Sequence, residues 1–211
     1  MTSALTPNSR ITSINSSLIF SLASIVFKYT ENMPESQAGY KYLLSYQYSS
    51  VIYDLTVEFC HFFINPKSRT HDQMTQAGRS GKQNIAEGSE FASLKGYIKL
   101  LGVAKGSLTE LTEDYEDYLR QKNLQLWKKD DLRIIKMREM RVLRDKDNNF
   151  TLPQFPHCPH DAELAANLLL TLCKKTTFLL DRQIKSLEEK FVKEGGYTEK
   201  LFRKRLENRN K

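Results

Sequence analysis

Large apolar residues recur at steps of three and four along several long stretches of the chain. Residues three and four apart share one face of an α-helix, so each stretch predicts an amphipathic helix. The first predicted helix covers residues 40–64 and stops before Asn65-Pro66, because a residue that precedes proline disfavours the helical conformation. Its apolar positions are Leu44, Tyr48, Val51, Ile52, Leu55, Phe59, Phe62 and Phe63.

The second predicted helix, residues 70–86, is poor in large apolar residues and rich in small ones. Its small residues include Ala77, Gly78, Ser80 and Gly81. Each mid-helix glycine costs about 1 kcal/mol relative to alanine. Either close packing against another helix or an exposed binding face accounts for them, and close packing is the favoured interpretation. Gly88 is predicted to end this helix as its C′ residue.

The third and fourth helices carry the longest apolar stripes. The third is predicted over residues 94–118, and the fourth over residues 161–194, with Asp161 as N-cap and Gly195-Gly196 at its end. The stripe of the third helix contains Leu94, Tyr97, Ile98, Leu101, Ala104, Leu108, Leu111, Tyr115 and Tyr118. That of the fourth contains Ala165, Leu168, Leu169, Leu172, Thr176, Leu179, Leu180, Leu187 and Phe191.

An insertion at residues 123–160 separates the third and fourth helices. Within it, residues 132–143 form a short basic amphipathic segment, and residues 145–159 are loop-like, with three prolines. A last short basic helix is predicted from Thr198, which would cap it. No strand pattern is present. The sequence therefore predicts an all-α fold: an antiparallel up-down four-helix bundle with a C-terminal helical extension. Apolar surface beyond what one bundle buries, on the first helix above all, favours self-association.

Residues 1–32 differ from the rest, being rich in Ser, Thr and Asn around one apolar run at residues 18–27. The run is too short to span a bilayer. Three interpretations stay open: a signal-like segment, a disordered or non-native extension upstream of Met33, or an extra helix. The expected domains are thus an extension (1–32), the bundle (33–196) and a basic tail (197–211).

The formal net charge is +7, and it is unevenly distributed. Residues 128–146 contain eight Lys or Arg against four acids, and residues 193–211 contain seven against three. The remainder of the chain is close to neutral. Two basic segments on a near-neutral body favour a polyanionic partner such as RNA or DNA, although solubility alone also accounts for surface charge.

Tests for catalytic and metal chemistry are negative at the sequence level. Residues 78–82 imitate a phosphate loop, but Gln76 and Gln83 stand where its glycine and its Ser or Thr belong. Glu58-x-x-His61 is a single copy of a motif that a di-iron bundle needs twice. The cluster His157-Cys158-Pro159-His160 falls short of four zinc ligands. No catalytic triad can be assembled, so we expect a protein that is not an enzyme, with no metal or cofactor.

The three cysteines, Cys60, Cys158 and Cys173, are odd in number and widely spaced, which is not a disulfide framework. Reduced thiols in a cytoplasmic protein that does not enter a membrane are the simplest account.

Two segments resemble a known family. Residues 76–88, QAGRSGKQNIAEG, and residues 101–121, LGVAKGSLTELTEDYEDYLRQ, resemble four-helix-bundle proteins encoded in intervening sequences of bacterial large-subunit ribosomal RNA genes. That group carries an N-I-A-E-G signature and a G-S-L-x-E-L stretch. Its fold includes the accessory variability protein of diversity-generating retroelements. Within this group the chain is most similar to the "four helix bundle suffix" subfamily, in which a C-terminal extension follows the bundle core. Two segments of this chain, LWKKDD and residues 179–205, resemble that extension. The resemblance covers residues 33–209.

The resemblance implies a homo-oligomeric ring, a pentamer by analogy with the retroelement relative, which is a basic barrel that binds nucleic acid and a reverse transcriptase. It implies no enzymatic activity. The insertion at residues 123–160 is a departure from the short members and leaves the ring geometry open. The expected function is an accessory factor that binds RNA or DNA. The alternative is a protein-interaction scaffold with no nucleic-acid role.

Candidate site residues follow from charge and from the signature. Within the signature, Asn84, Glu87 and Gly88 are predicted to brace the corner between the second and third helices, with Asn84 and Glu87 capping backbone groups there. Phosphate contacts need cations but no particular sequence. The predicted nucleic-acid-binding residues are Arg79, Lys82, Lys136, Arg141, Arg203, Lys204 and Arg205.

Overall fold

The computed structural model describes residues 39–147 and 149–209, and the interpretations of residues 1–32 lie outside them. A short 3₁₀ turn, Gly39–Tyr42, precedes the first α-helix. The elements that follow are α2 (Leu44–Phe63), α3 (Arg69–Glu90), α4 (Leu94–Gln121), α5 (Leu132–Glu139), β1 (Leu143–Arg144), β2 (Phe150–Thr151), α6 (Ala162–Glu194) and α7 (Tyr197–Arg209).

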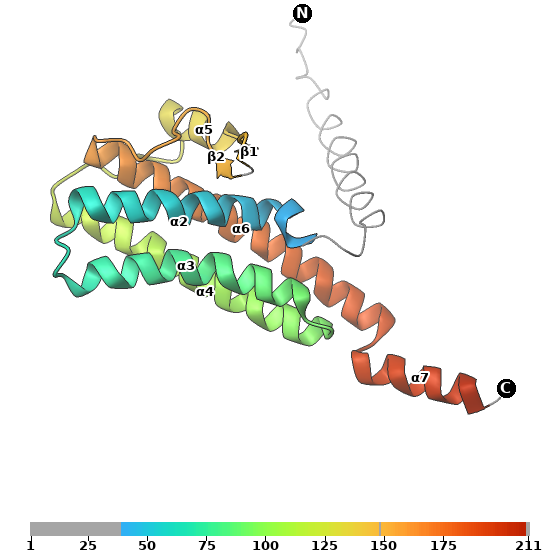
Figure 1. Cartoon of the computed structure of the whole chain (residues 1–211). Coiled ribbons are helices and arrows are strands. Elements are labelled where there is room, and N and C mark those ends of the chain that lie inside the picture. Colours follow the sequence, from blue (N-terminus) through green and yellow to red (C-terminus); the bar gives the residue numbers. More distant parts are fainter. Residues whose placement is uncertain (1–38, 148, 210–211) are drawn as a thin grey trace, which may run out of the picture. The chain divides into compact units, whose positions relative to one another are not determined.

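Helices α2, α3, α4 and α6 form an antiparallel up-down bundle (Figure 1). Around the bundle, α2 packs against α3, α3 against α4, α4 against α6, and α6 against α2. Helices α3 and α6 are therefore diagonal to each other. This arrangement confirms the predicted all-α bundle. The short connections from α2 to α3 and from α3 to α4 force these consecutive helices to lie side by side and run in opposite directions. The longer insertion connects α4 to α6.

The predicted apolar stripes form the core. Their central members are fully buried, and removing such side chains from water is the main force that holds the helices together. The largest of them are Ile52, Phe59, Leu101, Leu108, Leu111, Tyr115, Leu168 and Leu169, and Met74, Ile85 and Leu119, which lie outside the predicted stripes, are fully buried as well. One polar pair lies within this core, where the hydroxyls of Thr56 and Tyr115 share a 2.8 Å hydrogen bond. The pairing satisfies two groups that would be costly to bury alone.

Small residues on α3 allow close approach of its neighbours. A Cβ atom on Gly78 would lie 3.4 Å from the Cα atom of Tyr53 on α2. A Cβ atom on Gly81 would lie 2.8 Å from Leu108 Cδ2 on α4. The favoured interpretation, close helix packing, is confirmed.

The end of α3 differs from the prediction. Gly88 does not end the helix, which continues to Glu90; instead, a Cβ atom at Gly88 would lie 2.9 Å from the Tyr97 ring. Asn84 caps nothing at the corner: its Nδ2 donates to the main-chain oxygen and Oγ of Ser80, whose Oγ is 2.8 Å from Ser107 Oγ on α4.

Glu87 is exposed and accepts a hydrogen bond from Gln83, one turn earlier on α3. The cap of α4 is Ser93, whose hydroxyl accepts from Gly96 N–H. The predicted corner role of the signature is therefore wrong for Asn84 and Glu87, because α3 runs past both.

The insertion covers the outer side of α2 and α6. Helix α5 packs on α6, and β2 packs on α2. The strands were not foreseen; they pair antiparallel over only two residues each. Tyr48 Oη donates to Met140 O at 2.7 Å, and the rings of Tyr46 and Phe150 meet edge to face. The aromatic surplus predicted on the first helix is thus largely covered by the chain itself, although Leu44 and Phe62 stay exposed.

The ends of α6 match the prediction. The Asp161 carboxylate accepts from Leu164 N–H, and Gly195, with φ 75°, ends the helix. Helix α7 then begins at Tyr197 rather than being capped by Thr198, and the Glu199 carboxylate accepts from Gly196 N–H. No residue of α7 is buried. None of the helices in the described part of the chain has the length and apolar content to cross a membrane.

Candidate nucleic-acid interface

The seven predicted cations fall on three separate elements. Arg79 and Lys82 lie on α3, Lys136 and Arg141 lie on α5 and just after it, and residues 203–205 lie on α7. Because α5 packs on α6, which is diagonal to α3, the α3 pair belongs to a different surface. Lys82 is also engaged, with its Nζ 4.5 Å from the centre of the Tyr53 ring. The structure does not bring the seven residues into one patch.

An open cleft lies between α6, α5 and the loop that leads into α5. Its volume is about 430 Å³, and its floor is apolar. The apolar lining residues are Leu126, Trp127, Ile134, Leu170 and Phe178. Four cations line the same cleft: Lys129, Arg138, Lys174 and Lys175. No acidic residue of the described segments is among the lining residues.

The four cations differ in how they are held. Lys174 forms a 2.7 Å ion pair with Glu116. Lys175 Nζ donates to the main-chain oxygens of Arg138 and Met140, at 2.7 and 2.8 Å, which fixes the C-terminal end of α5 against α6. A cation is favoured there because carbonyl groups at a helix C-terminus carry partial negative charge. Arg138 Nη1 donates to Lys129 O.

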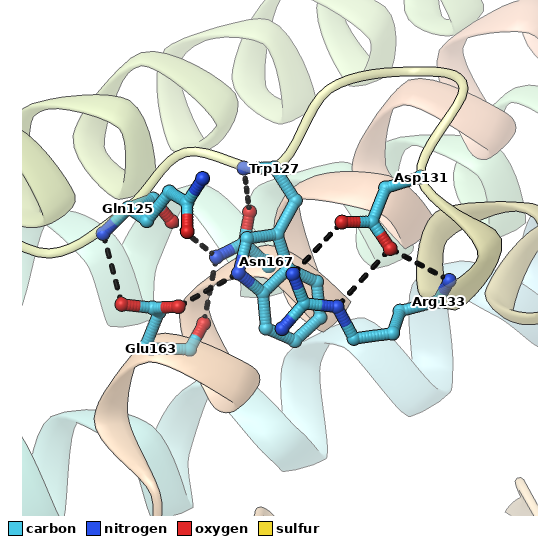
Figure 2. A network of polar contacts seen from close by, with 6 residues as sticks. All are labelled: Gln125, Trp127, Asp131, Arg133, Glu163 and Asn167. Carbon is cyan, nitrogen blue, oxygen red and sulfur yellow. Dashed lines mark hydrogen bonds and ion pairs between the residues drawn. The ribbon is translucent and has the colours of Figure 1, made fainter.

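Polar contacts from α6 position the wall of the cleft (Figure 2). Asn167 Oδ1 accepts from Trp127 N–H at 2.9 Å, and Asn167 Nδ2 donates to Gln125 O at 2.9 Å. Glu163 accepts from Gln125 N–H through one carboxylate oxygen and from Trp127 Nε1 through the other. One turn of α6 therefore holds Gln125 and Trp127, two residues of a loop that has no regular structure of its own.

An ion pair covers one face of the tryptophan. The Arg133 guanidinium lies 3.6 Å from the centre of the Trp127 ring and forms hydrogen bonds with the Asp131 carboxylate. These hydrogen bonds from Arg133 hold the pKa of Asp131 below its ordinary value. The backbone N–H of Gln125, followed by Trp127 Nε1, likewise lowers the pKa of Glu163. Both carboxylates are thus ionised at neutral pH, as these contacts require.

A second cleft, between α3 and α4, has the opposite charge. Its volume is about 500 Å³, and its acidic lining residues are Glu110, Glu113, Asp114 and Asp117. Burial first, and then the neighbouring carboxylates, raise the pKa of Asp114. Nevertheless, no three His, Cys, Asp or Glu side chains in the described segments are arranged to hold a metal ion. The cleft between α5 and α6 is thus lined by cations, whereas the cleft between α3 and α4 is lined by acidic residues.

The residues considered for metal or thiol chemistry have structural partners. Glu58, the first residue of the single Glu-x-x-His motif, accepts from Cys158 N–H at 2.6 Å and lies 3.1 Å from His157 Nδ1. It therefore fastens the loop before α6 to α2. The three cysteines are free and buried, and burial raises the pKa of Cys60 to about 11 and that of Cys158 to about 12. Thiols this weakly acidic are poor nucleophiles at neutral pH.

The cleft residues on α6 were not singled out from the sequence. Lys174 and Lys175 interrupt the apolar stripe of this helix, and Phe178 follows one turn later on the exposed side. The sequence feature that could have indicated this cleft is the pair of adjacent lysines within the mainly apolar first half of α6. Their proximity to Trp127 depends on the path of the insertion, which periodicity does not describe.

Comparison with known proteins adds no relative. The chain matches no family model, no curated protein and no solved structure. The resemblance to the intervening-sequence bundle proteins therefore stays a prediction that rests on the residues quoted for it.

Proposed function

We propose that this protein is a non-enzymatic accessory factor that binds nucleic acid through the basic segment of its insertion. The observation that supports the proposal is uncompensated charge. Of the six Lys and Arg residues between 128 and 141, only Arg133 has a carboxylate partner within 4.0 Å among the described residues. We call the other five the cationic face: Lys128, Lys129, Lys136, Arg138 and Arg141.

Uncompensated cations on a rigid surface suit a phosphate backbone. Each cation that neutralises a phosphate releases a condensed counterion, which makes affinity fall steeply with salt. All five side chains of the cationic face are exposed, so a strand reaches them without a conformational change. The basic residues of α7, which has no buried residue, supply a second exposed cationic segment.

The primary test is salt-dependent binding. Purified protein is titrated into fluorescently labelled RNA and DNA oligonucleotides between 50 and 200 mM KCl, with anisotropy as the readout. For five phosphate contacts, affinity is expected to fall roughly a hundredfold for single strands and roughly five hundredfold for duplex DNA over this range. Binding that is absent at 50 mM KCl, or that is insensitive to salt, would reject the proposal in favour of a protein-interaction scaffold.

Charge-reversal variants test which surface binds. Lys136→Glu with Arg141→Glu is expected to weaken binding at least tenfold, and reversal of Arg203, Lys204 and Arg205 tests the contribution of α7. Lys95→Glu with Lys99→Glu changes the net charge equally, on exposed positions of α4 away from the insertion. Equal losses from the α5 and α4 pairs would show that overall charge, rather than the cationic face, determines affinity.

We propose in addition that the protein forms a homo-oligomer. The insertion covers the outer side of α2 and α6, whereas α4 presents Val103, 43% exposed, between two glycines. Cβ atoms on Gly102 and Gly106 would meet nothing within 4 Å, so another helix can approach α4 closely. Light scattering is expected to give a multiple of the 24.5 kDa chain mass, and that multiple gives the ring size. The mass of a single chain at tens of micromolar protein would reject self-assembly.

A further inference from the structure

The cleft between α5 and α6 combines an apolar floor with a cationic rim. Its volume of about 430 Å³ lies within the range of small-ligand sites. Phosphate contacts alone require only a charged surface, such as the cationic face. An apolar hollow next to that face is therefore unexplained by backbone binding. It fits a ligand in which a flat, weakly polar group is joined to an anion.

The cleft is held in shape before any ligand arrives. Trp127 is only 7% exposed, because Arg133 covers one ring face and Glu163 accepts from its indole N–H. Lys175 fixes the end of α5 by bonding to two of its carbonyl groups. Groups that are already ordered lose little entropy on binding, so the geometry favours a specific occupant over a chance one.

One aromatic ring in the cleft is open for stacking. Phe178 on α6 is 59% exposed, lies one turn after Lys174, and lines the same cleft as Trp127. Arg182, one turn later, has its guanidinium carbon 5.8 Å from the centre of the Phe178 ring. An exposed aromatic ring between cations is the arrangement on which unpaired bases stack, with phosphates held at the sides.

From this geometry we infer that the cleft accepts an unstacked base of a single-stranded nucleic acid, with Phe178 as its stacking surface. Lys129 and Arg138 hold the adjacent phosphates. A base within a duplex is already stacked and paired on its edges, so it reaches the cleft only at the cost of leaving the helix. The inference rests on the proposed nucleic-acid function and specifies its substrate as single-stranded.

The test compares four probes against the full-length protein. The probes are a mixed-sequence 12-nucleotide single strand, its duplex, an abasic strand of equal length, and adenosine monophosphate. Trp127 is the only tryptophan of the chain, so its fluorescence reports on the cleft. We expect the single strand to change this fluorescence and to bind at least fivefold more tightly than the duplex or the abasic strand. Adenosine monophosphate is expected to bind far more weakly, because it lacks the neighbouring phosphates.

Phe178→Ala is the decisive variant, and Phe91→Ala is its matched control. Both rings are exposed to a similar extent, 59% and 55%, and Phe91 lies between α3 and α4, outside both basic segments. Losing one stacked base lowers affinity roughly 5- to 150-fold. We expect this loss for the single strand with Phe178→Ala only, and no change for the abasic strand.

The outcomes separate this inference from the proposed function. Salt-dependent binding that is equal for single strand, duplex and abasic strand, or that is unchanged by Phe178→Ala, would overturn the base-binding cleft and leave the cationic face intact. Equal affinity for adenosine monophosphate and the strand would overturn it in favour of a free-nucleotide site. Loss of all binding in the wild-type protein would instead reject the proposed function.

Discussion

The bundle and the insertion are built by different forces. In the bundle, fully buried apolar side chains from four helices fill one core. The insertion, residues 123–160, has few such residues and is held mainly by single polar side chains that bond to its main chain. Its anchors include Tyr48 and Glu58 on α2, and Asn167 and Lys175 on α6. The bundle thus derives its stability from buried apolar surface area, and the insertion from a few hydrogen bonds between side chains and its main chain.

This difference predicts that the two regions respond differently to mutation. A core substitution lowers the stability of all four helices together, because they share one core. Loss of a directed contact releases only the segment that it holds, since local opening costs less than global unfolding. Three experiments, in order of decreasing effect, test whether the two regions behave in this way.

The largest effect is expected from Leu108→Ala on α4. Leu108 is fully buried and contacts the α3 surface at Gly81, so its truncation leaves a cavity. The free energy of unfolding is expected to fall by about 2–5 kcal/mol, measured by urea denaturation with circular dichroism. Val57→Ala, at an exposed position of α2, should change it by less than about 0.5 kcal/mol. Equal effects from the two variants would contradict the core described above.

Asn167→Ala is expected to have an intermediate and local effect. The change leaves the buried Trp127 N–H and Gln125 O without partners, which costs about 1–3 kcal/mol. Hydrogen exchange should accelerate in residues 122–140, and the Trp127 emission should shift to the red. Ser186→Ala, farther along α6, is the control. Equal acceleration in α3 would show that the insertion and the bundle open as one unit.

The smallest effect is expected from acid acting on Glu163. Its pKa in the folded protein lies below the ordinary 4.5, so its contribution to stability is complete above pH 4.5 and declines as the pH falls through the folded-state value. Protonation weakens its bonds to Gln125 N–H and Trp127 Nε1. A reversible red shift of the Trp127 emission should therefore appear below pH 4.5. In Glu163→Gln this acid-dependent shift should be smaller; an identical pH profile would assign the transition to other groups.

The same difference explains which features the sequence foretold. Periodicity at three and four residues identified α2, α4 and α6, since burial of a stripe is what creates the pattern, whereas α3 was predicted without a stripe of large apolar residues. It also predicted the ends of α6, where Asp161 and Gly195 act through local backbone chemistry. It failed at Gly88, Asn84 and Glu87, because a glycine that permits close packing and one that ends a helix look alike in sequence.

The cleft could not be assembled from the sequence, because its parts depend on the insertion. Trp127 and Phe178 are brought together only by contacts such as Asn167 with residues 125 and 127, across some forty positions of chain. Hydrogen bonds between residues so far apart produce no periodic pattern in the sequence. The charge of residues 128–141 was visible in advance, but the apolar hollow beside it was not.

The length of α6 has a consequence for how target size affects binding. From Lys174 to the glycines at 195–196, the helix runs for 21 residues, or about 32 Å at 1.5 Å per residue. Lys175, at the start of this span, bonds to Arg138 O of the cationic face, and the basic residues of α7 follow its far end, so this part of α6 separates two attachment points. Once a strand is held at one point, the other meets it at a millimolar effective concentration. Affinity should therefore rise abruptly, rather than gradually, once the oligonucleotide is long enough to bridge that span.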